Sequence, residues 1–201
     1  MFTPTIAPPL IRKPKAKLYT LDEYLEKEAQ TAHKHQFFNG HIQQMAGAKF
    51  KHNQIATNVV FAFKIAVRPL EKRYLVINSD QKIYIASENT ALYPDALVIS
   101  EKPEFYEGRE DLITNPLVIV EVLSKSTERY DRGEKFMLYQ KCPSFREYIL
   151  IEQETLYVES WFRIKENTWE RTSETDREKS LAIRSIGVEL SVGEVYAEVE
   201  M

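Results

Sequence analysis

The chain has 201 residues, of which 43% are hydrophobic and 28% are charged, so it can bury a core and wholesale disorder is excluded. Its formal net charge of −3 argues against tight general binding to duplex DNA, because basic residues supply most of that affinity. No apolar run approaches the roughly 20 residues that span a bilayer. The single cysteine, Cys142, excludes an internal disulfide and fits a reducing compartment, so we expect a cytoplasmic protein with no membrane partner.

The first 17 residues are basic and rich in proline, and their four cations leave the rest of the chain with a net charge of −7. We expect residues 1–17 to be a flexible lead-in and residues 18–201 to form a single domain. An arm that binds nucleic acid is the alternative reading of the lead-in, although its composition favours a solvated tail.

Three helices are predicted along the chain. A capping box formed by Thr20 and Glu23 predicts the first, which ends near residue 32. Apolar residues at helical spacing predict the second over residues 53–68 and a third over residues 127–142, and a proline follows each of these two.

Runs of apolar and β-branched residues between turn residues predict strands. These strands cover residues 42–46, 74–78, 82–86, 96–100, 117–123, 148–151 and 156–164, with further strands between residues 169 and 196. Residues 101–116 are charged and contain proline, which predicts a loop. This order of elements predicts an α/β protein of the α+β kind, with helices flanking a mixed β-sheet rather than regular βαβ winding.

One acid lies inside the most apolar predicted strand. Glu121 is surrounded by valine, isoleucine and leucine in residues 117–123. A buried carboxylate without a partner costs several kcal/mol, so it becomes protonated, finds a partner or holds a metal ion. An acid near a strand end can also reach solvent, so the residue type alone leaves a structural and a functional role open.

A second acid, Asp95, follows Pro94 at the start of the preceding strand. If strands 96–100 and 117–123 pair in antiparallel fashion, the start of one lies beside the end of the other. Asp95 and Glu121 would then face each other at one edge of the sheet. Two adjacent carboxylates are hard to keep ionised without a cation, so this pairing predicts a site for Mg²⁺ or Mn²⁺.

A third group of polar residues lies on the following helix. Asp131, Lys135 and Tyr139 are spaced four apart and share one helical face, which can return to the carboxylates. Lys135 would there orient a water molecule or stabilise charge on a phosphate. An ordinary surface ion pair between Asp131 and Lys135, and simple packing of Tyr139, are the alternatives.

Two further side chains are candidates for supporting roles. His52, near the start of the second helix, could contact substrate, and it could equally bond a loop. Ser124 is expected to cap the third helix, and its hydroxyl is close enough in sequence to support Glu121.

These residues, with the phrases around them, resemble the Uma2 family, also called DUF820, a branch of the PD-(D/E)XK nuclease superfamily that is abundant in cyanobacteria. The resemblance rests on Pro94-Asp95, on residues 121–124, and on Asp131, Lys135 and Tyr139 in that order. It extends to residues 19–25, Asn39-Gly40, His52-Asn53 and residues 145–148, and so covers nearly the whole domain.

The resemblance implies a restriction-endonuclease-like fold in which Asp95 and Glu121 are metal ligands. The superfamily usually places its catalytic lysine two residues after the glutamate, where this chain has Leu123. Other branches carry the lysine on the next helix, which matches Lys135 and completes a catalytic set of Asp95, Glu121 and Lys135. Lys125 is a substitute that is expected to face solvent.

One position departs from the family pattern. Family members commonly carry a glutamate just before the segment 37–40, where it can join the metal site, and this chain has Gln36. Glutamine keeps a carbonyl oxygen but loses a charge, which weakens a site for a hard cation.

We therefore expect a metal-dependent DNA endonuclease with Mg²⁺ (or Mn²⁺) as cofactor and DNA as substrate. A homodimer is expected because many enzymes of the superfamily cut both strands as dimers. Two alternatives stay open. One is a weakened or inactive nuclease-fold module that binds nucleic acid or protein, and the other is a structural oligomer with Glu121 and Lys135 as a buried ion pair.

Overall fold

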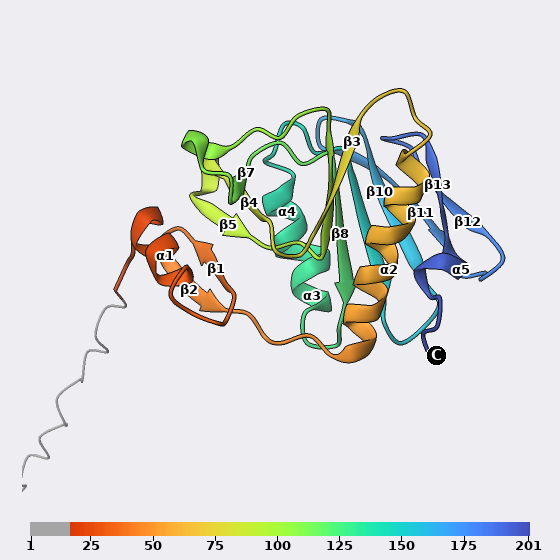
Figure 1. Cartoon of the computed structure of the whole chain (residues 1–201), viewed down its shortest axis with the longest axis horizontal. Helices are drawn as coiled ribbons and strands as arrows, with labels where there is room; N and C mark the ends of the chain where they lie inside the picture. Colours follow the sequence, from red (N-terminus) through yellow and green to blue (C-terminus); the bar gives the residue numbers. More distant parts are fainter. Residues whose placement is uncertain (1–16) are drawn as a thin grey trace, which may run out of the picture.

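A computed structural model describes residues 17–201 (Figure 1). A six-stranded sheet lies at its centre. From one edge to the other its strands are β11 (Thr168–Glu174), β10 (Val158–Lys165), β9 (Glu147–Glu152), β8 (Val118–Leu123), β6 (Ala96–Ser100) and β3 (Tyr74–Asn78). Only β8 and β9 pair in parallel, and the other neighbours are antiparallel. The predicted mixed sheet is therefore confirmed, and the segment predicted as a basic lead-in lies, apart from Lys17, outside the described residues.

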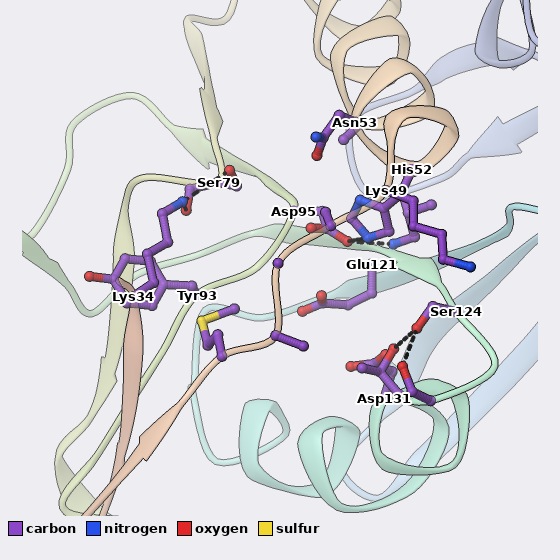
Figure 2. Close-up of a pocket in the computed structure, with 18 of the residues that line it drawn as sticks. Lys34, Lys49, His52, Asn53, Ser79, Tyr93, Asp95, Glu121, Ser124 and Asp131 are labelled. Atoms are coloured by element: carbon purple, nitrogen blue, oxygen red, sulfur yellow. Dashed lines mark hydrogen bonds and ion pairs between the residues drawn. The ribbon is translucent and has the colours of Figure 1, made fainter. Parts of the chain in front are cut away.

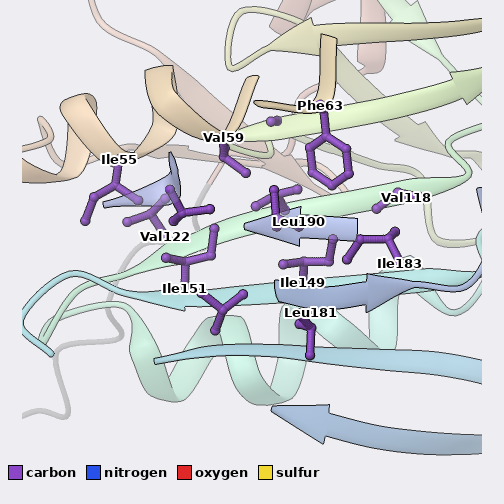
Figure 3. Packing of buried hydrophobic residues seen from close by; sticks show 14 of the residues in the cluster. Ile55, Val59, Phe63, Val118, Val122, Ile149, Ile151, Leu181, Ile183 and Leu190 are labelled. Atoms are coloured by element: carbon purple, nitrogen blue, oxygen red, sulfur yellow. The ribbon is translucent and has the colours of Figure 1, made fainter. Parts of the chain in front are cut away.

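Helix α2 (Phe50–Val67) covers one face of this sheet. Its residues Ile55, Val59 and Phe63 are fully buried at helical spacing and pack against alternate valines and isoleucines of the strands (Figure 3). The layer is completed by β12 (Ser180–Ile183), β13 (Val188–Ser191) and α5 (Val192–Val195). The prediction of strand up to residue 196 was wrong for α5. The Ser191 side chain accepts a hydrogen bond from the Glu194 N–H and so starts a helical turn.

The opposite face of the sheet packs against the helix that follows β8. This helix consists of α3 (Glu128–Tyr130), a π-helical turn (Asp131–Lys135) and α4 (Phe136–Tyr139). Tyr139 and Cys142 pack with Ile119 and Leu123 of β8, which point away from α2. A helix was predicted here, but its π-turn was not.

A second sheet of five strands lies beside the first. Its strands are, in order, β2 (His41–Gln44), β1 (His35–Phe38), β5 (Thr90–Leu92), β4 (Lys82–Ile85) and β7 (Leu112–Ile113). Helix α1 (Leu21–Glu28) covers it with Tyr24 and Leu25, and the predicted capping box between Thr20 and Glu23 is present. The loop predicted over residues 101–116 contains β7, which pairs in parallel with β4. Strand β5 has no counterpart among the predicted elements.

A cavity of about 840 Å³ opens where these layers meet, at the carboxyl end of β8. Its walls come from β1 and β2, from the segment leading into α2, from the first turns of α2, and from the helix after β8. Within residues 17–201, no helix combines the length and the apolar character of a membrane span.

Candidate active site

The pairing of β6 with β8 brings the two predicted carboxylates to the cavity. Ala96 lies opposite Val120 in an antiparallel register, so Asp95 stands opposite Glu121 one step further along. The Asp95 N–H donates to the Val120 carbonyl at 3.1 Å, and Asp95 Oδ2 accepts the Val122 N–H at 2.7 Å. Figure 2 shows both carboxylates in the cavity that they line.

Glu121 forms a buried ion pair with Lys135. The distance from Lys135 Nζ to Glu121 Oε2 is 2.7 Å, and each side chain is only 4% exposed. Tyr139 donates its hydroxyl to Glu121 Oε1 at 3.0 Å. The face formed by Lys135 and Tyr139 therefore returns to Glu121, as the four-residue spacing predicted.

The π-turn accounts for the alignment of this face. In a regular α-helix each step of four residues rotates the side chain by about 40°, so two steps would separate Asp131 from Tyr139 by about 80°. A π-turn has more residues per turn, so the angle between the side chains of Asp131 and Lys135 is smaller than in a regular α-helix. Asp131 Oδ1 consequently lies 3.5 Å from Lys135 Nζ, while Tyr139 still contacts Glu121.

Negative charge predominates in this buried cluster. Burial raises the pKa of Glu121 well above its ordinary value, and although Lys135 opposes this, Asp131 and Asp95 reinforce it. Burial likewise raises the pKa of Asp131. Burial opposes the charge of Lys135, but Glu121 and Asp131 outweigh it and raise the Lys135 pKa, so the ammonium stays protonated. The carboxylates thus compete for one permanent cation, and a further positive charge would stabilise the cluster.

His52 contacts Asp95 from the first turn of α2. Its Nε2 lies 3.2 Å from Asp95 Oδ2, while its buried Nδ1 has no hydrogen-bond partner among the described residues. Burial lowers the pKa of His52, but the hydrogen bond and charge of Asp95 outweigh it, and the pKa is raised. Burial also opposes ionisation of Asp95, but His52, Lys135 and the Val122 N–H hold the Asp95 pKa below its ordinary value. His52 is therefore part of the site through Asp95.

Gln36 lines the cavity from β1, a strand of the second sheet. The Tyr130 hydroxyl donates to Gln36 Oε1 at 3.1 Å, which fixes the amide oxygen. The sequence analysis identified Gln36 but not Tyr130. The only local indication that Tyr130 lies near the site is that it precedes Asp131.

Ser124 lines the cavity without contacting Glu121. Its Oγ bonds the hydroxyls of Ser126 and Thr127 at 3.1 and 3.0 Å, and its carbonyl accepts the N–H groups of Thr127 and Glu128. The prediction that Ser124 caps the helix was wrong, because the N-cap of α3 is Thr127 and the Ser124 hydroxyl bonds only its neighbours in the preceding turn. The contact with Glu121 that its sequence position allowed is not formed either. Lys125, in the same turn, is exposed at the mouth of the cavity.

A second set of contacts that the sequence did not predict holds the helix in place. Arg132, inside the π-turn, pairs with Glu128, Glu152 and Glu159. The Tyr148 hydroxyl donates to the Asp131 carbonyl at 3.0 Å. These contacts hold the π-turn in place, so the position of Lys135 depends on residues far from it in sequence.

Residues 21–193 match the model of the Uma2 family, which is described as "Putative restriction endonuclease". Two proteins of Synechocystis sp., both described as uncharacterized, are similar in sequence. One, sll1609, is 34% identical over 153 residues, which are 76% of this chain and 85% of the relative. The other, slr1290, is 31% identical over 176 residues, which are 87% of this chain and 90% of the relative.

One solved structure, from Anabaena variabilis ATCC 29413, has the same fold. It is described as "a putative nuclease belonging to DUF820" and superposes with a TM-score of 0.70 at 17% sequence identity. The match covers 90% of this chain and 99% of the other, so it extends over nearly the whole architecture.

Proposed function

This chain belongs to the Uma2 family, and from that premise we propose that it is a metal-dependent nuclease that hydrolyses phosphodiester bonds of DNA. The observation that carries the proposal is the convergence of Asp95, Glu121 and Lys135, from three separate segments, on one cavity of about 840 Å³. A nuclease-type fold for the chain is supported by its solved neighbour, as the sequence predicted.

The donor set fits a hard divalent cation. Asp95 and Glu121 offer carboxylate oxygens, and within residues 17–201 no hydrogen bond or ion pair occupies Asp95 Oδ1. The described residues contain no group of three acidic, histidine or cysteine ligands that could enclose a metal ion. Mg²⁺ does not require such a cage, because it commonly binds through one or two carboxylates, water and substrate phosphate. We propose Asp95 and Glu121 as the ligands, with Mg²⁺ or Mn²⁺ as the ion, which would lower the pKa of a water molecule and stabilise phosphate charge.

The remaining roles follow from the contacts of each side chain. Lys135 Nζ lies 2.7 Å from Glu121 and 3.5 Å from Asp131 and lines the cavity, so we assign its ammonium to orienting a water molecule or a phosphate oxygen. Tyr139 holds the Glu121 carboxylate through Oε1, and Asp131 keeps Lys135 charged. His52 and the Val122 N–H fix the rotamer of Asp95.

Replacing Asp95 by asparagine tests the assignment. We expect the wild-type protein to cleave DNA in Mg²⁺ but not in EDTA, and Asp95→Asn to lose at least about 10²-fold in rate while it stays folded. Asp111→Asn, on a partly exposed aspartate that pairs with Lys82 away from the cavity, is the matched control. Undiminished cleavage by Asp95→Asn would exclude Asp95 from the reaction.

A second candidate function is a nuclease-fold module that binds nucleic acid or protein without cutting. It is favoured by Gln36, which supplies no charge, and by Glu121, whose two oxygens are already engaged by Lys135 and Tyr139. Calorimetric titration with Mn²⁺ separates the two candidates. Absence of binding, together with absence of cleavage of any DNA, favours the module.

Assembly and domain organisation belong to the proposal as well. We propose a homodimer, so that two sites can act on two strands, and a single domain over residues 18–201, which the family match over residues 21–193 supports. Sedimentation equilibrium tests the homodimer, and limited proteolysis tests the single domain.

A further inference from the structure

Acidic residues are unevenly distributed along this chain. Residues 29–70 contain no aspartate or glutamate, although the whole protein has 30 acidic residues and a net charge of −3. The same segment holds all four histidines and five cations, which are Lys34, Lys49, Lys51, Lys64 and Arg68. It forms β1, β2, the segment that lines the cavity, and all of α2.

The outer face of α2, defined here as Phe50, Asn53, Thr57, Phe61, Lys64, Ile65 and Arg68, points away from the sheet. At 3.6 residues per turn, Phe50, Phe61 and Arg68 lie within about 20° of one line along the helix. Phe50 is 83% exposed, Phe61 60% and Ile65 53%, whereas Ile55, Val59 and Phe63 on the other side bury the core. Large apolar side chains and cations thus share a solvent-facing surface that carries no acid.

The outer face is continuous with the cavity at one end and with a basic hollow at the other. At the N-terminal end Lys49 and Asn53 line the cavity that holds Asp95 (Figure 2). At the C-terminal end Lys64 and Arg68 line a second hollow of about 490 Å³, together with Lys72, Arg73 and one acid, Glu71. Within residues 17–201, Lys49, Lys64 and Arg68 form no ion pair with an acid, and Lys51 has only a 3.8 Å contact with Glu154.

We propose that the outer face of α2 binds a single-stranded polynucleotide that flanks the phosphate held in the cavity, with bases stacked on Phe50 and Phe61 and phosphates bound by Lys64 and Arg68. This assignment rests on the proposed nuclease function and adds the strand structure of its substrate. Bases of a duplex are stacked inside it, so exposed phenylalanine rings reach base faces only on an unpaired strand. A second copy of the chain suits the surface less well, because a symmetric contact would bring together the cations of α2, which carries no acid of its own.

The test measures binding by the full-length protein in EDTA, where metal-dependent cleavage cannot occur. Fluorescence anisotropy follows a labelled 20-nucleotide DNA strand, the RNA strand of the same sequence, and the DNA duplex, each over a series of salt concentrations. The variants are Phe50→Ala with Phe61→Ala, and Lys64→Gln with Arg68→Gln. The matched controls are Met137→Ala with Ile164→Ala, which are also exposed apolar residues, and Lys102→Gln with Lys165→Gln.

We expect the wild type to bind at least one single strand more tightly than the duplex. Loss of both phenylalanines should weaken that binding at least about tenfold, because stacking contributes about 1–3 kcal/mol per base. Loss of Lys64 and Arg68 should reduce the slope of log K against log salt by about 1.4, since each phosphate contact on a single strand contributes about 0.7. Both control pairs should behave as the wild type, and the DNA and RNA arms identify which polynucleotide is preferred.

Binding by the two α2 variants within twofold of the wild type, or a preference of the wild type for duplex, would overturn the assignment. So would size-exclusion chromatography showing that the phenylalanine variant turns a dimer into a monomer and still binds the strand. If Asp95→Asn abolishes cleavage while the α2 variants bind normally, the nuclease function stands and only the assignment of α2 falls. If the α2 variants lose binding and the wild type cleaves nothing in Mg²⁺, the nuclease function falls and the assignment of α2 as a binding surface stands.

Discussion

Glu121 and Glu147 are buried carboxylates on adjacent parallel strands of one sheet, and their surroundings differ in kind. Glu147 is fully buried and accepts hydrogen bonds from the Ser160 hydroxyl and from the backbone N–H groups of Arg184 and Ser185. Glu121 shares the single ammonium of Lys135 with Asp131, and it lines a cavity.

Glu159, on the next strand, resembles Glu147. It is fully buried, and Arg132, Tyr157 and Trp161 all donate to it. Burial of an acid in this sheet therefore does not mark a functional residue. What distinguishes the Glu121 region is an excess of carboxylates over cations beside an open cavity, where a metal ion and a substrate can enter.

The largest difference is expected in catalysis. Glu121→Gln keeps the shape of the side chain but removes a proposed metal ligand, so we expect Mg²⁺-dependent cleavage to fall at least about 10³-fold. Glu147→Gln, the matched change on the next strand, should cleave like the wild type per folded molecule. Equal loss in both variants, measured under single-turnover conditions, would remove the distinction between the two regions.

For folding stability, we expect the larger effect at Glu147 and the smaller effect at Glu121. Glu147→Ala leaves the Ser160 hydroxyl and two backbone N–H groups buried without an acceptor, so we expect unfolding to become easier by about 3–5 kcal/mol. Glu121→Gln relieves repulsion from Asp131 and Asp95, and Lys135 keeps Asp131 as a partner, so the change should stay within about 1 kcal/mol. Urea unfolding in EDTA measures both values, and a Glu121 variant as unstable as the Glu147 variant would contradict the account.

The dependence of stability on pH should report the burial of Glu121. The pKa of Glu121 in the folded protein is raised above its ordinary value of 4.5, so the folded state holds a proton that the unfolded state releases. The stability that this proton contributes is present below pH 4.5 and is lost as pH rises through the folded-state pKa. Relative to Glu121→Gln, the metal-free wild type should therefore lose stability as pH increases above 4.5. A difference that is constant or grows in favour of the wild type would show that Lys135 fully compensates Glu121.

A smaller effect is expected from restoring an acid at position 36. Gln36→Glu adds a carboxylate to the cavity wall where Tyr130 already orients the side chain, and we expect Mn²⁺ to bind about tenfold more tightly by calorimetry. Gln43→Glu is the control, since Gln43 pairs with Gln36 across β1 and β2 and lines the same cavity. An equal gain from both variants would indicate a general effect of charge rather than a ligand at position 36.

The sequence predicted the carboxylates of the site better than it predicted their partners. Asp95 and Glu121 could be placed together because two strands joined by a loop have one simple antiparallel register, and that register is observed. The four-residue spacing likewise predicted that Lys135 would share a face with Tyr139. These inferences depend only on local periodicity.

Contacts between distant segments could not be predicted in this way. Helix α1 was predicted to end near residue 32 but ends at Glu28, whose carboxylate accepts hydrogen bonds from the His35 N–H and the Tyr93 hydroxyl. The start of α2 was predicted three residues late, because Lys49 forms no side-chain cap that would mark it. The π-turn depends on Arg132 reaching two other strands.

The most direct test of the metal site is a crystal soaked in MnCl₂ and measured at the manganese absorption edge. We expect anomalous density in the cavity, with carboxylate oxygens of both Asp95 and Glu121 about 2.0–2.2 Å from the ion. No density should appear beside Glu147 or Glu159. A cavity without manganese at millimolar concentration, with Glu121 still bonded to Lys135 and Tyr139, would contradict the account and leave Glu121 as one more buried structural acid.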